Sequence, residues 1–95
     1  MAEAGRASDG DWCERFAASL SGAGVPSPVT TAAIQALLLR MAGDIAHSTE
    51  RKNAPVAAFI AGQYVEARRS QGVAAEAALD EAAEVVARLL RDATR

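Results

Sequence analysis

The sequence predicts an all-α protein, folded as a four-helix up-and-down antiparallel bundle. Apolar residues recur at the i, i+3, i+4, i+7 spacing of amphipathic helices in four segments, and no segment shows strand-like alternation. Short stretches that contain glycine, proline or asparagine separate the segments, which favours antiparallel neighbours. Much of the 51% hydrophobic content is alanine, a composition that suits thin helices packed closely together.

The first two helices are separated by a glycine- and proline-containing linker. The first is expected to begin near Ser8, where the run SDGD can form a capping box, and to end before Gly22, with Trp12 and Phe16 as its anchors. The second is expected to begin at Pro28, after a serine N-cap, and to end at about Ser48. Its inward stripe consists of apolar residues at helical spacing: Ile34, Leu37, Leu38, Met41 and Ile45.

The third and fourth helices follow the same pattern. Asn53 is expected to cap the third, which has Pro55 in its first turn and ends at Gln71-Gly72. Its inward residues are Val56, Phe59, Ile60, Tyr64 and Ala67. The fourth is expected over residues 74–92, with its inward residues Leu79, Ala82, Ala83, Val86, Leu89 and Leu90.

A chain of 95 residues has room for one domain with one core. We expect a flexible N-terminus at 1–8, a single helical bundle domain over 9–92 and a frayed C-terminus at 93–95. The predicted core gathers large side chains from all four helices: Trp12, Phe16, Leu38, Met41, Ile45, Phe59, Ile60, Val86 and Leu90.

Composition excludes several classes of protein. The net charge is -2 with acidic and basic residues interspersed, so no nucleic-acid-binding surface is expected. Cys13 is the only cysteine, which excludes an internal disulfide, and the N-terminal residues lack a signal-peptide pattern. No apolar run approaches the length of a membrane span. We expect a cytoplasmic protein, and the bias toward arginine and alanine indicates a GC-rich bacterial gene.

A polar cluster lies between the second and third helices: Asp44, His47, Glu50, Arg51, Lys52 and Asn53. Arg40, Asp44, His47 and Arg51 fall on one stripe beside the apolar face. One interpretation is a solvated helix end with an Arg40–Asp44 ion pair and an Asp44–His47 contact. The other is an anion-binding site in which Asp44 orients His47. Its ligand residues would be Asp44, His47, Arg51, Lys52 and Asn53, beside the first amides of the third helix.

Metal binding and catalysis have less support. Asp44 and His47 have a spacing that could direct two ligands at one ion, but the chain has no other histidine and no cysteine cluster. Cys13 has no histidine nearby in sequence, and Tyr64 is interpreted as a ring at the edge of the core. We therefore expect no metal, no cofactor and no catalytic residue, and the sequence leans against an enzyme.

A second surface is predicted from small and apolar residues outside the main stripes. Ala58, Gly62 and Val65 form a second face on the third helix, and Leu39 lies away from the stripe of the second. Apolar residues on two faces of a helix are hard to bury in so small a monomer. These four residues are the predicted interface of a homodimer or a hetero-complex.

These residues also carry a resemblance. The run LLLRMAGDIAH at 37–47, then Glu50-Arg51, Ala54-Pro55 and the run FIAG at 59–62, resembles a small bacterial domain family of unknown function. That family is encoded beside, or fused to, the molybdenum cofactor guanylyltransferase. Asp11-Trp12 and the alanine-rich last helix extend the match over nearly the whole chain, whereas Lys52-Asn53 departs from the smaller or prolyl residues of the family pattern.

Two classes of function remain open. The resemblance implies an association with molybdopterin cofactor maturation, and the favoured hypothesis is a non-catalytic accessory protein that docks on a cofactor-handling enzyme or on itself. The alternative is an anion-, nucleotide- or pterin-binding domain that uses His47 and Arg51.

Overall fold

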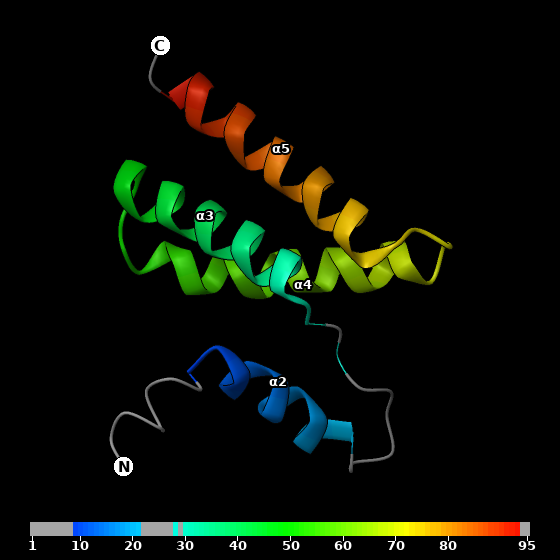
Figure 1. Cartoon of the computed structure of the whole chain (residues 1–95). Coiled ribbons are helices and arrows are strands. Elements are labelled where there is room, and N and C mark those ends of the chain that lie inside the picture. Colours follow the sequence, from blue (N-terminus) through cyan, green and yellow to red (C-terminus); the bar gives the residue numbers. More distant parts are fainter. Residues whose placement is uncertain (1–8, 22–27, 29, 94–95) are drawn as a thin grey trace. The chain divides into compact units, whose positions relative to one another are not determined.

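The computed structural model describes residues 9–21, 28 and 30–93 (Figure 1). This part of the chain contains four α-helices, α2 (Asp9–Leu20), α3 (Ala32–Ser48), α4 (Asn53–Arg69) and α5 (Ala75–Ala93), and no strand. The predicted all-α class with four helices is therefore confirmed. The predicted N-caps at positions 8 and 27, and most of both predicted terminal segments, lie outside the described residues.

The chain divides into two compact units, residues 1–31 and residues 32–95. In the first unit, the rings of Trp12 and Phe16 stack along α2, with their centroids 5.4 Å apart and their planes 25° from parallel. Their spacing of four residues puts them on one face of the helix. That Trp12 and Phe16 share a core with the other helices stays a prediction.

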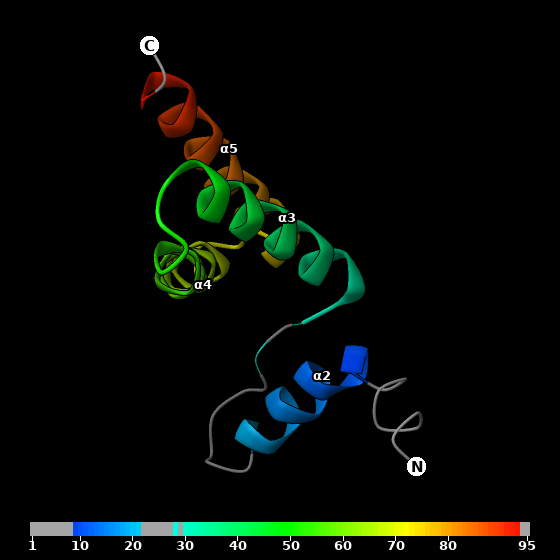
Figure 2. The same ribbon diagram turned by 90° about the vertical axis from the view of Figure 1, so that its left-hand side faces the viewer.

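In the second unit, α3, α4 and α5 each contact the other two. Helices α3 and α5 run in the same sense and α4 runs in the opposite sense (Figures 1 and 2). Consecutive helices therefore alternate in direction, as the short connections predict. No helix in the described residues is long and apolar enough to cross a membrane.

The core of this unit is built from all three helices, and α4 contributes mainly small residues to it. Met41, Ile45, Ala61 and Leu79 are buried together. Partly buried residues surround them: Ile34, Leu37, Leu38, Ala57, Val65, Ala82, Ala83 and Val86. The predicted stripe of α3 is confirmed, and so are the core positions of Leu79 and Val86.

The inward face of α4 differs from the prediction. Phe59 and Ile60 were expected in the core, but they are 70% and 58% exposed, and Val56 and Tyr64 are exposed as well. Ala61 and Val65 face the core instead. Helix α4 carries apolar residues on nearly all sides, so periodicity alone does not determine which side turns inward. Leu89 of α5 is likewise exposed rather than inward.

The starts of α3 and α4 differ from the predicted ones. Helix α3 begins at Ala32 and not at Pro28, because Thr30 and Thr31 are not helical. Threonine is β-branched and loses side-chain freedom in a helix, which disfavours an early start. Asn53 is the first residue of α4 and not its cap, because Lys52 holds the cap position without a side-chain hydrogen bond. The side-chain amide of Asn53 donates from Nδ2 to Thr49 Oγ1 at 3.1 Å.

Helix α4 ends at Arg69, two residues before the predicted stop at Gln71-Gly72. Gly72 has φ of +91°, a left-handed conformation that a residue without a Cβ adopts most readily. This turn lets the Val73 amide donate to the Arg68 carbonyl at 3.1 Å, which satisfies a carbonyl at the end of the helix. The tight turn then lets α5 begin at Ala75 and run back along α4.

Candidate functional site

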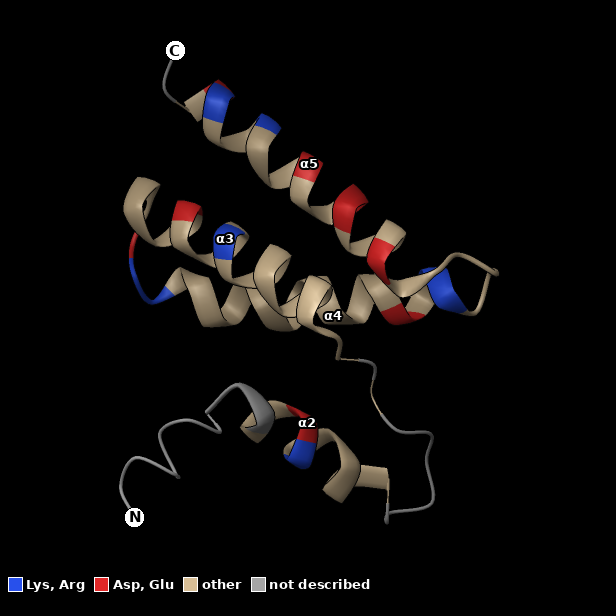
Figure 3. Ribbon diagram, in the orientation of Figure 1, with Lys and Arg blue, Asp and Glu red and all other residues tan. Residues whose placement is uncertain are grey.

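The predicted ligand residues lie along the end of α3, the turn after it and the start of α4. Asp44 and His47 project from α3, Arg51 and Lys52 occupy the turn, and Asn53 begins α4. All five side chains are exposed. Figure 3 places the charges of this connection at the end of the unit where α3 meets α4.

The interactions in this region are few and exposed. Lys52 Nζ lies 3.3 Å from Glu50 Oε1, but both side chains are mostly in solvent, so this ion pair adds little to stability. In the described part of the chain, no side-chain hydrogen bond or ion pair involves Arg40, Asp44, His47 or Arg51. The Arg40–Asp44 pair and the Asp44–His47 contact of the sequence analysis are therefore not formed.

The start of α4 is a poor anion site by itself. The Asn53 amide donates to the Glu50 carbonyl at 2.9 Å, and the Ala54 amide donates to the Arg51 carbonyl at 3.2 Å. The third residue is Pro55, which has no amide hydrogen. An anion at this end would therefore depend on the side chains of His47 and Arg51 for its binding energy.

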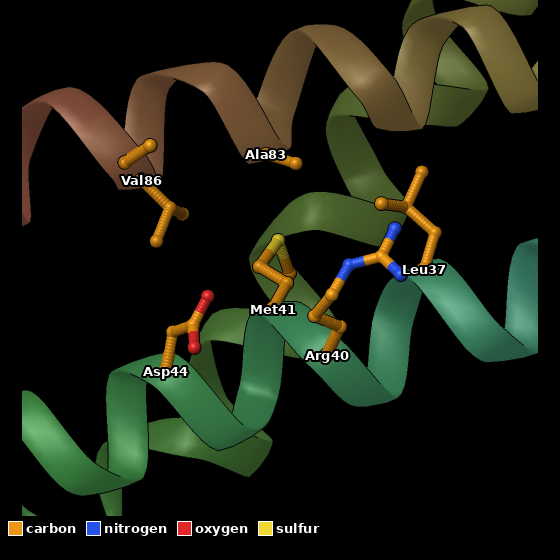
Figure 4. A pocket seen from close by; sticks show the side chains of 7 residues that line it. Leu37, Arg40, Met41, Asp44, Ala83 and Val86 are labelled. Atoms are coloured by element: carbon orange, nitrogen blue, oxygen red, sulfur yellow. The ribbon is translucent and has the colours of Figure 1, made fainter.

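A small cavity of about 60 Å³ lies between α3 and α5, next to Arg40 and Asp44. In Figure 4, the Arg40 guanidinium lies beside Leu37, and the Asp44 carboxylate lies on the other side of Met41. The two charged groups therefore do not converge on one point. Pockets that bury a nucleotide-sized ligand measure roughly 300–1,000 Å³, so this cavity is too small for one.

A polar network that the sequence analysis missed joins α4 to α5. The Tyr64 hydroxyl donates to Glu81 Oε1 at 2.6 Å. The Arg68 guanidinium donates to both oxygens of the Glu81 carboxylate, from Nε at 3.0 Å and from Nη2 at 3.2 Å. A third donor, Arg68 Nη1, reaches Gln71 Oε1 at 2.6 Å. Tyr64 and Arg68 are four residues apart on α4, but nothing in the sequence identifies Glu81 of α5 as their partner.

The network shifts the ionisation of its members. The hydrogen bonds from Arg68 and from Tyr64 lower the pKa of Glu81. The hydrogen bond to Glu81 raises the pKa of Tyr64, with smaller contributions from desolvation and from the charge of Glu81. The hydrogen bonds that Arg68 itself donates to Glu81 raise the pKa of Arg68. At neutral pH the network therefore holds a carboxylate, a guanidinium and a neutral phenol, and no member is positioned as an acid or base that would exchange protons there.

Several exposed apolar residues of the second unit lie on α4 and α5. We call them the α4–α5 face, which consists of Val56, Phe59, Ile60, Tyr64, Val85 and Leu89, all 41–70% exposed. Four of them, Ile60, Tyr64, Val85 and Leu89, line a groove of about 400 Å³ between the two helices. Exposed apolar residues scattered singly are ordinary, whereas these four share one groove on two packed helices.

The predicted interface residues do not form one surface. Leu39 is 72% exposed on α3, as expected, and Gly62 is exposed on α4. Ala58 is half-buried, and Val65 packs against the core. The space that a Cβ at Gly62 would occupy is open, so close packing against another helix of this unit does not explain that glycine.

Leu39 instead belongs to a mixed surface on α3. Ala36, Leu39, Arg40, Gly43 and His47 share one side of the helix, at the i, i+3, i+4 spacing. A Cβ at Gly43 would also meet open space. We call these five residues the α3 outer face.

No group of three or more potential metal ligands gathers in the described residues. Cys13 is exposed on α2 and carries a free thiol.

Comparison with known proteins gives one match. No curated protein and no solved structure matches this chain. Residues 6–95, nearly the whole sequence, match a domain family of unknown function, DUF6457. The chain therefore belongs to the DUF6457 family.

Proposed function

We propose that this protein is a small, non-catalytic accessory protein that acts by binding another protein through the α3 outer face. The observation that supports this proposal is the 72% exposure of Leu39, the most exposed large apolar residue of the described chain. A single exposed leucine is ordinary on a protein surface, but this one lies between Ala36 and Gly43, whose small side chains leave room for a partner to contact it.

The neighbours of Leu39 suit an interface. Ala36 and Gly43 leave space on either side of the leucine along the helix, so a partner can approach closely. Arg40 and His47 lie at the edge of this surface and form no ion pairs within the described residues. An apolar centre with a polar rim is the usual arrangement of a protein–protein contact, and arginine is enriched in such contacts.

For the partner, we propose the molybdenum cofactor guanylyltransferase or another enzyme that handles that cofactor, in the bacterial cytoplasm. The support is the resemblance described above, to a family encoded beside or fused to that enzyme. A shared gene neighbourhood is an associational argument, and a direct binding measurement is needed to test it.

The experiment is retention of the purified guanylyltransferase on the immobilised full-length chain. We expect Leu39→Glu to weaken binding at least about tenfold, because a charge replaces the apolar centre. Ala77→Glu is the matched control, since Ala77 is exposed on α5, away from the α3 outer face. Equal retention of both variants would reject the α3 outer face, and no retention of the enzyme by the wild type would reject the partner.

A second function, anion binding by His47 and Arg51, is favoured by one observation. Both side chains are exposed and unpaired among the described residues, so both are free to contact a phosphate. A thermal-shift assay with GTP, a pterin and inorganic phosphate tests it. If binding occurs here, Arg51→Ala abolishes the shift, whereas Arg91→Ala on α5 leaves it unchanged.

A further inference from the structure

We draw no further inference here: the strongest candidate, the apolar groove between α4 and α5 that Ile60, Tyr64, Val85 and Leu89 line, carries none because nothing in the structure shows what covers it.

Discussion

Leu79→Ala tests whether the small cluster of Met41, Ile45, Ala61 and Leu79 supplies most of the stability of the second unit. Leu79 is 3% exposed. Truncation removes three carbon atoms from a buried side chain, which costs about 2.4 kcal/mol at about 0.8 kcal/mol for each buried methylene. The surrounding side chains fill the resulting cavity only in part, and the remaining cavity adds to the cost. We therefore expect a total loss of about 3 kcal/mol in the free energy of unfolding.

The assay is urea unfolding followed by circular dichroism, at one protein concentration so that any association affects every variant equally. A loss of about 3 kcal/mol would also lower the melting temperature by roughly 12–24 °C for a unit of this size. Ile45→Val, at another buried position, provides a graded comparison with an expected loss of about 1 kcal/mol. Leu39→Ala is the exposed control and should change stability by less than about 0.5 kcal/mol. A loss below about 1 kcal/mol for Leu79→Ala would refute this assignment of the core.

Two further predictions concern glycines and the polar network. Gly62→Ala should raise the free energy of unfolding by about 0.5–1 kcal/mol, because alanine is the better helix former and the space for its Cβ is open. Gly72→Ala should lower the free energy of unfolding by about 1–2 kcal/mol, because Gly72 has a positive φ. Urea unfolding measures both, and a loss of stability for Gly62→Ala would mean that another group packs against Gly62. In a spectrophotometric titration, Glu81→Gln should bring the raised pKa of Tyr64 back toward its ordinary value. The lowered pKa of Glu81 contributes stability above the ordinary carboxyl pKa, and this contribution is lost as pH falls through the folded-state value, so Glu81→Gln should flatten the acid limb of the stability profile. An unchanged acid limb would show that the network is not linked to folding.

Helix positions were predictable from the sequence because they depend on local signals. The stripe of α3 contains large residues on one side and small or polar residues on the other, so periodicity gave both the helix and its inward face. Gly72 marked the end of α4 because a left-handed turn favours glycine. The start of α3 was placed too early because a proline after a serine can begin a helix but does not require one.

The candidate site was predictable only in part. Arg40, Asp44 and His47 do project from the exposed part of α3, as their spacing predicts. Their pairing was not predictable, since exposed charges gain little from an ion pair in water and lose side-chain freedom when they form one. The network of Tyr64, Arg68 and Glu81 depends on how α4 and α5 align, which local patterns do not encode.

The inward face of α4 carries two alanines, Ala57 and Ala61. Helix axes approach to about 8 Å only where small side chains meet, and larger side chains push them toward about 10 Å. Ala57 and Ala61 face the core of a unit in which α4 touches both α3 and α5. If α4 were rotated to bury Phe59 and Ile60 instead, both neighbours would have to move outward, and the cluster around Met41 would lose its contacts. The exposed α4–α5 face is therefore a consequence of close packing among alanines. Large apolar residues that lie outside add to the stability of such a unit only when another surface covers them.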